Sequence, residues 1–101
     1  MVQWDVIKSI KDKTTQDLYD GVNSKAARKI PMSLHQRARD LLDVIHAATS
    51  LGDLRIPPSN RLHQLKDDLI GFWSVSINDQ YRIIFRWIEG NAEDVEITDY
   101  H

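Results

Sequence analysis

The spacing of apolar residues changes along this chain, and that change constrains the fold more than any other feature. In the C-terminal half, apolar residues recur at every second position, which places successive side chains on opposite faces of a strand. Three segments show this alternation: 73–77, 81–87 and 95–98. Turn-forming residues lie between them, at Asn78-Asp79 and at Glu89-Gly90-Asn91. The pattern predicts an antiparallel meander with a hairpin turn at Asn78 and Asp79, two residues that tolerate positive φ.

The N-terminal half shows the spacing of a helix instead. Residues 33–50 carry apolar side chains three or four apart, which predicts an amphipathic helix that begins after Pro31 and ends at Gly52. Helical spacing followed by strand alternation is typical of an α+β fold.

The remaining segments predict shorter elements. Thr14 begins a capped short helix that runs towards Tyr19 and ends at Gly21. Residues 1–10 predict an edge strand, and residues 53–62, which contain two prolines, predict a loop.

Length, cysteine content and the N-terminal segment limit the classes of protein to which this chain can belong. A chain of 101 residues predicts a single domain over 1–101. There is no cysteine, so disulfides and thiol chemistry are excluded, in keeping with a reducing cytoplasm. The N-terminus has no long apolar run, so we expect neither a signal peptide nor a membrane span.

The charge distribution limits any binding of nucleic acid. The net charge is −2, with eight basic and six acidic residues in 1–50 but five basic and nine acidic residues in 51–101. Strong nucleic-acid binders usually carry a broad basic surface, because neutralised phosphates supply most of the affinity. Any such activity here must depend on a few well-placed cations, or on a carrier that presents the strand.

Neither a metal nor a cofactor is expected. The four histidines lack the close spacing of a preformed metal site. His35 and His46 lie about three turns apart on one predicted helix, too far to share an ion. The chain also lacks a glycine-rich phosphate loop.

Four segments of the C-terminal part resemble the HigB-type toxins of the RelE/ParE superfamily, also called the plasmid maintenance killer family. The resemblance covers residues 61–101, in the family's order and spacing. The segments are Arg61-Leu62-His63-Gln64-Leu65-Lys66, Gly71-Phe72-Trp73-Ser74-Val75, Tyr81-Arg82-Ile83-Ile84-Phe85 and Asp99-Tyr100-His101.

The resemblance implies a fold and an activity. The fold is RelE-like (microbial-ribonuclease-like), with N-terminal helices packed on one face of a twisted antiparallel sheet. The activity is that of a toxin in a type II toxin–antitoxin system, a ribosome-dependent endoribonuclease that cuts mRNA in the cytoplasm by attack of the 2′-hydroxyl, without metal. The implied partners are the ribosome, mRNA and a helix-turn-helix antitoxin of the HigA type, through which alone the toxin would reach operator DNA.

The resemblance also assigns candidate catalytic residues. His101 is the leading one, because imidazole exchanges protons near physiological pH. Arg82 should contact phosphate, since its side chain points away from the apolar set of its strand and its planar guanidinium suits a charged phosphorane. Lys66 is a point charge for the same phosphate or a solvated residue.

Other positions have both a functional and a structural interpretation. His63 matches the family's active-site histidine or caps the loop. Asp99 and Tyr100 orient His101 and contact RNA, or simply complete the strand. Tyr81 and Trp73 lie on an apolar face, so core packing is favoured over stacking on a base. The basic residues of the first half are candidates for ribosomal RNA contacts: Lys25, Arg28, Lys29 and Arg37.

The sequence departs from the family beside the proposed site. Where relatives have Lys-Gly-Asp-Arg, this chain has Lys66-Asp67-Asp68-Leu69, so a glycine and an arginine are lost and the turn should change shape. Asn78 stands where some relatives carry arginine. Two alternatives therefore stay open: a weakened or non-catalytic module that docks an antitoxin and tunes its DNA binding, and a ParE-like gyrase inhibitor. ParE-like proteins generally lack the Asp-Tyr-His ending.

Overall fold

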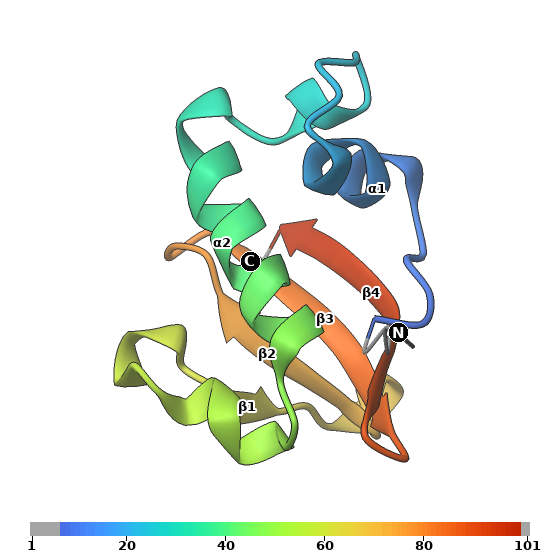
Figure 1. The fold of residues 1–101 in the computed structure, drawn as a ribbon, viewed down its shortest axis with the longest axis vertical. Coiled ribbons are helices and arrows are strands. Elements are labelled where there is room, and N and C mark those ends of the chain that lie inside the picture. The colour runs from blue at the N-terminus through green and yellow to red at the C-terminus, as the bar shows by residue number, and fades with distance from the viewer. Residues whose placement is uncertain (1–6, 100–101) are drawn as a thin grey trace, which may run out of the picture.

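The computed structural model describes residues 7–99, and it places two helices on one face of a four-stranded antiparallel sheet (Figure 1). The strands follow one another in space as they do in sequence, β1-β2-β3-β4. This arrangement confirms the predicted α+β fold. The elements are α1 (Lys13–Asp20), α2 (His35–Ala47), β1 (His63–Gln64), β2 (Phe72–Ser76), β3 (Tyr81–Ile88) and β4 (Asn91–Asp99).

Helix α1 ends where the sequence predicted, but its N-cap lies two residues earlier. Asp12, not Thr14, is the N-cap, and its carboxylate accepts a hydrogen bond from the Thr15 N–H at 3.1 Å. Gly21 ends the helix in the left-handed conformation, at φ 74°. Asp12 provides a charged acceptor for the free amides of the first turn, which accounts for its selection over the threonine.

Helix α2 is shorter than predicted. A 3-10 turn (Met32–Leu34) precedes it, and it ends at Ala47 rather than at Gly52. The reason lies in the side chain of Asp53, which accepts hydrogen bonds from the backbone N–H groups of Thr49 and Ser50 at 2.9 and 3.3 Å. These bonds begin a new 3-10 turn, Leu51–Arg55, and Gly52 lies inside it.

The predicted loop over residues 53–62 is in fact mostly 3-10 turns. Leu51–Arg55 is followed by a second one, Pro58–Asn60, and the chain then enters β1, which the sequence did not predict. Asn60 holds this segment together. Its side chain is 1% exposed and its Nδ2 donates to the carbonyls of Leu54 and Ile56, both at 3.3 Å.

The two hairpins of the meander differ in their turns. Between β2 and β3 the predicted hairpin turn is present and spans residues 77–80, but neither Asn78 nor Asp79 takes positive φ. Instead the Asn78 side chain accepts from the N–H groups of Gln80 and Tyr81 at 2.9 and 2.7 Å, so a side chain forms the turn. Between β3 and β4, Glu89 and Gly90 both take positive φ (50° and 80°), as a tight two-residue hairpin requires.

The outer edge of β4 is covered by the start of the described chain. Ile7 and Ile10 form isolated parallel bridges to Ala92 and Val95, and the rest of the expected edge strand, residues 1–6, lies outside the described residues. The Val95 N–H donates to the Ser9 carbonyl at 3.0 Å, and the Ile97 N–H donates to the Thr15 hydroxyl at 2.9 Å. These bonds satisfy donors that an open edge strand would leave free.

The core lies between the two helices and the sheet. The most deeply buried side chains come from both layers: Leu18, Leu42, Ile45, Leu54, Val75, Ile83, Phe85 and Val95.

None of the helices in residues 7–99 is long and apolar enough to span a membrane.

Candidate functional site

The register of the sheet gathers polar side chains on the face opposite α1 and α2. Residues paired across adjacent antiparallel strands project to the same face. Ser76 pairs with Arg82, which in turn pairs with Thr98. His63 pairs with Ser74 in the neighbouring row. Because the core-forming side chains alternate with these residues, His63 and Arg82 lie on the face away from the helices.

A pocket of about 200 Å³ opens among these side chains. It combines an imidazole, two guanidinium groups, two serine hydroxyls, a phenol and one carboxylate. Guanidinium groups bind the oxygens of a phosphate, and an imidazole can transfer a proton. This set of groups can therefore hold a phosphodiester and act on it. The lining residues are Arg61, His63, Ser74, Ser76, Asn78, Asp79, Tyr81 and Arg82.

Arg82 lies on this face in β3, between its paired residues Ser76 of β2 and Thr98 of β4. It is half-buried, and its strand neighbours Tyr81 and Ile83 pack against the core on the other side. The alternation had predicted this orientation, opposite to the apolar set of Tyr81, Ile83 and Phe85. Tyr81 packs against the core and also lines the pocket. Trp73 packs against the core, as its position in the alternation predicted.

The predicted C-terminal triplet is described only at its first residue. Asp99 is exposed, is the last residue of β4 and pairs with Tyr81. Its carboxylate accepts a hydrogen bond from the Gln80 side chain at 3.3 Å. Tyr100 and His101 lie outside the described residues. The described chain therefore ends beside a residue that lines the pocket.

Lys66 is exposed and does not line the pocket. It precedes a 3-10 turn, Asp67–Leu69, that separates β1 from β2. Asp67, which replaces the family's glycine, takes positive φ at 56°. Aspartate tolerates this conformation better than most residues. The loss of the glycine therefore did not remove a left-handed residue from this turn.

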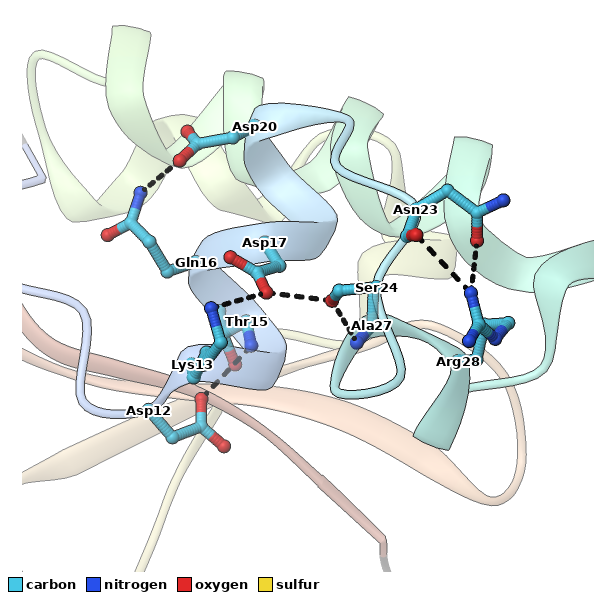
Figure 2. Close-up of polar contacts among 10 residues, drawn as sticks. All are labelled: Asp12, Lys13, Thr15, Gln16, Asp17, Asp20, Asn23, Ser24, Ala27 and Arg28. Carbon is cyan, nitrogen blue, oxygen red and sulfur yellow. Dashed lines mark hydrogen bonds and ion pairs between the residues drawn. The ribbon is translucent and has the colours of Figure 1, made fainter.

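The four basic residues that were predicted to contact ribosomal RNA fall into two groups. Lys25, Arg28 and Lys29 are exposed, in or next to the 3-10 turn Ala27–Lys29. Arg28 donates to the Asn23 side chain at 2.9 Å (Figure 2). Arg37 is half-buried and donates to the carbonyls of Ser76 and Ile77 at 3.4 and 3.5 Å, so it braces the end of β2.

The segment that carries the exposed basic residues is held by a carboxylate. The Ser24 hydroxyl donates to Asp17 at 2.7 Å and accepts from the Ala27 N–H at 3.0 Å (Figure 2). The hydrogen bond from Ser24, followed by that from Lys13, lowers the pKa of Asp17 below its usual 3.8. Asp17 is thus a permanent anion at neutral pH, and it ties α1 to the following turn.

A second shifted group lies between the helices. Burial, and then the hydrogen bond that the Tyr19 hydroxyl donates to Asp43 at 3.0 Å, raise the pKa of Tyr19 to about 12. Tyr19 is therefore neutral and acts as a hydrogen-bond donor.

Within residues 7–99, no group of three His, Cys, Asp or Glu side chains is placed to hold a metal ion.

Four residues of the pocket were not predicted as site residues from the sequence: Arg61, Ser74, Ser76 and Asp79. Arg61 had a visible signal, because it lies two residues before His63 in a segment that resembles the family. The two serines occupy the polar positions of the alternation in β2. Nothing local marked Asp79, which enters the pocket only through the β2–β3 turn.

Two solved structures of toxins have the same fold. One is the YoeB-YefM complex from Staphylococcus aureus, with a TM-score of 0.59 and 15% identity over 94% of this chain and 97% of that chain. The other is the YoeB/ParE toxin from Agrobacterium tumefaciens, with a TM-score of 0.55 and 17% identity over 94% of this chain and 100% of that chain. The fold is therefore RelE-like, as the resemblance implied.

Sequence similarity identifies the family to which the chain belongs within this fold. Residues 8–101 match the HigB-like toxin family, described as the RelE-like toxin of the type II toxin-antitoxin system HigB. The chain is 40% identical to Toxin HigB-1 of Vibrio cholerae serotype O1 over 82 residues, which are 81% of this chain and 84% of that protein. It is 36% identical to Endoribonuclease HigB of Proteus vulgaris over 97 residues, which are 95% of this chain and 100% of that protein. The chain belongs to the HigB-like toxin family.

Proposed function

We propose that this protein is the toxin of a type II toxin–antitoxin pair and that it cuts mRNA in the ribosomal decoding site. The observation that carries this proposal is the pocket on the helix-free face, which brings His63 and Arg82 together with two hydroxyls. Membership of the HigB-like toxin family and the name of the Proteus vulgaris relative, an endoribonuclease, support it.

The proposed reaction is an internal transfer of the phosphodiester. The 2′-oxygen forms a bond to phosphorus, the bond to the 5′-oxygen breaks, and the products are a 2′,3′-cyclic phosphate and a 5′-hydroxyl. One group accepts the 2′-hydroxyl proton, another donates a proton to the leaving oxygen, and a cation stabilises the phosphorane. Arg82 supplies the cation, while His63 and His101 supply the two proton transfers.

Asp99 and Tyr100 complete the proposed site by orienting His101 and contacting the RNA. The support for this assignment is that Asp99, which precedes Tyr100 and His101 in the sequence, pairs with the pocket residue Tyr81. Lys66 adds positive charge to the approaching strand from outside the pocket.

We propose that the ribosome supplies the affinity that this surface lacks. The net charge is −2, and the half of the chain that holds the pocket has nine acidic against five basic residues. Such a surface binds free RNA weakly at cellular salt, because affinity depends on neutralised phosphates. A ribosome that fixes and bends the mRNA also aligns the 2′-hydroxyl for attack. Lys25, Arg28 and Lys29 would face ribosomal RNA together with Arg37.

The proposed partner is a helix-turn-helix antitoxin of the HigA type, which holds the toxin silent in the cytoplasm and carries it to operator DNA. Membership of a toxin–antitoxin family supports a partner of this class. Copurification of the toxin with the product of the neighbouring gene tests this part of the proposal. A toxin that purifies alone from cells expressing both genes contradicts it.

Primer extension on mRNA from cells that express this chain alone tests the activity. We expect new 5′ ends inside translated frames, and none when an initiation codon is removed so that the same transcript is not translated. Growth arrest without cleavage would point to another target such as gyrase. The absence of both effects would indicate a non-catalytic module.

A further inference from the structure

The pocket contains a second cation that the proposed chemistry has not used. Arg61 lines it together with Arg82, from the segment that leads into β1. Across the pocket, Arg61 Nη1 lies 3.6 Å from Asp79 Oδ1, which belongs to the β2–β3 turn. The two side chains are 69% and 98% exposed.

The backbone beneath Arg61 is fixed in an unusual conformation. Arg61 has φ 51°, in the left-handed region, and its N–H donates to the Pro58 carbonyl at 3.0 Å. The preceding residue, Asn60, is buried and anchors the loop through its two hydrogen bonds. Glycine takes this conformation with the least strain, so the backbone gives no reason for an arginine here. The presence of an arginine side chain at position 61 therefore needs a reason other than the backbone conformation.

The ion pair with Asp79 does not explain the presence of an arginine at this position either. An ion pair that is this long and this exposed contributes little to stability, since water screens it. A phosphate carries two oxygens that match the fork of a guanidinium, and it binds such a group more strongly than a distant carboxylate does. Asp79 thus holds Arg61 weakly enough for an anion to displace it.

We propose that Arg61 binds a phosphate of the RNA strand adjacent to the one held by Arg82, and that Asp79 competes for Arg61 when RNA is absent. This inference rests on the proposed function, and it deepens it by adding a second phosphate position to the same pocket. Asp79 then acts as a built-in counter-charge that weakens the binding of free RNA.

Binding of a short RNA with 2′-O-methyl groups, which cannot be cleaved, tests the proposal with the full-length protein. Fluorescence anisotropy is measured between about 50 and 200 mM salt. We expect Arg61→Gln to weaken binding about three- to tenfold, and to reduce the slope of log affinity against log salt by about 0.7, the value for one contact to a single strand. Asp79→Asn should strengthen binding about two- to fivefold.

Arg55→Gln is the matched control, because Arg55 is an exposed arginine of the same loop region that does not line the pocket. It removes the same charge and should leave the salt slope close to that of the wild type. If Arg61→Gln proves unstable, Arg61→Gly should keep the left-handed backbone, unfold no earlier than the wild type and show the same loss of binding. Equal binding by the Arg61 and Arg55 variants would overturn the phosphate site. Unchanged binding by Asp79→Asn would overturn the competition.

A second probe separates this inference from the proposed function. Titration with inorganic phosphate, followed by NMR of the arginine side chains, reports the site without any RNA. Cleavage of mRNA in cells together with phosphate binding that ignores Arg61 would reject the inference and leave the function standing. Phosphate binding that requires Arg61 in a protein that cuts no mRNA would do the reverse.

Discussion

The hydrogen bond between Thr15 and Ile97 connects α1 to the edge of β4, and its removal has a predictable cost. The Ile97 N–H donates to Thr15 Oγ1 at 2.9 Å, and the two residues are 6% and 0% exposed. Valine has nearly the shape of threonine but offers no acceptor. Thr15→Val therefore leaves the Ile97 N–H buried without a partner while the packing is kept.

An unsatisfied buried donor costs about 1–3 kcal/mol, and the added methyl group recovers part of this through its burial. We expect a net loss of about 1–2 kcal/mol in the free energy of unfolding. Because a domain of this size is stable by only about 5–15 kcal/mol, this is a large fraction of the total. It corresponds to a fall in Tm of about 4–16 °C.

Urea denaturation and calorimetry measure the effect, and two variants serve as controls. Thr15→Ser keeps the acceptor and loses one methyl group, so it should cost about 1 kcal/mol or less. Thr14→Val makes the same chemical change at the half-buried neighbour and should stay within about 0.5 kcal/mol of the wild type. A Thr15→Val protein as stable as Thr14→Val would refute the argument that this bond satisfies a buried donor.

Three further predictions concern the site and the pH dependence of stability. His101→Ala should lower mRNA cleavage about 10²- to 10⁴-fold at unchanged Tm, measured by primer extension, since it removes a proton-transfer group; normal growth arrest by the soluble variant would exclude His101. Arg82→Ala should abolish cleavage and Arg82→Lys should restore only part of it, because a point charge replaces a fork; equal activity of lysine and arginine would show that only charge matters. The lowered pKa of Asp17 stabilises the fold above its unfolded value of 3.8, and this stabilisation is lost as pH falls through the lower folded pKa. The deficit of Ser24→Ala in urea should therefore be constant above about pH 4 and shrink in more acidic solution; a deficit that grows there would contradict this assignment.

Features that depend on a few consecutive residues could be predicted from the sequence. The two-residue alternation located β2, β3 and β4 to within a few residues, because the strand period is a local property of the backbone. Gly21 and the Glu89-Gly90 turn were predicted for the same reason, since glycine takes positive φ without a steric penalty. The segments that resemble HigB-type toxins likewise identified the family and pointed to His63 and Arg82.

Features that depend on distant partners appeared only in the tertiary structure. Helix α2 ends early because the Asp53 side chain competes for the amides that follow it. The short strand β1 forms because β2 offers it a partner, as two isolated residues carry no periodicity that could predict a strand. Arg61 and Asp79 meet because the buried Asn60 and the β2–β3 turn bring two loops to one pocket. Local backbone preferences locate most of the elements, whereas the end of α2, the strand β1 and the site depend on contacts, sheet register and loop anchoring that arise only when the whole chain has packed.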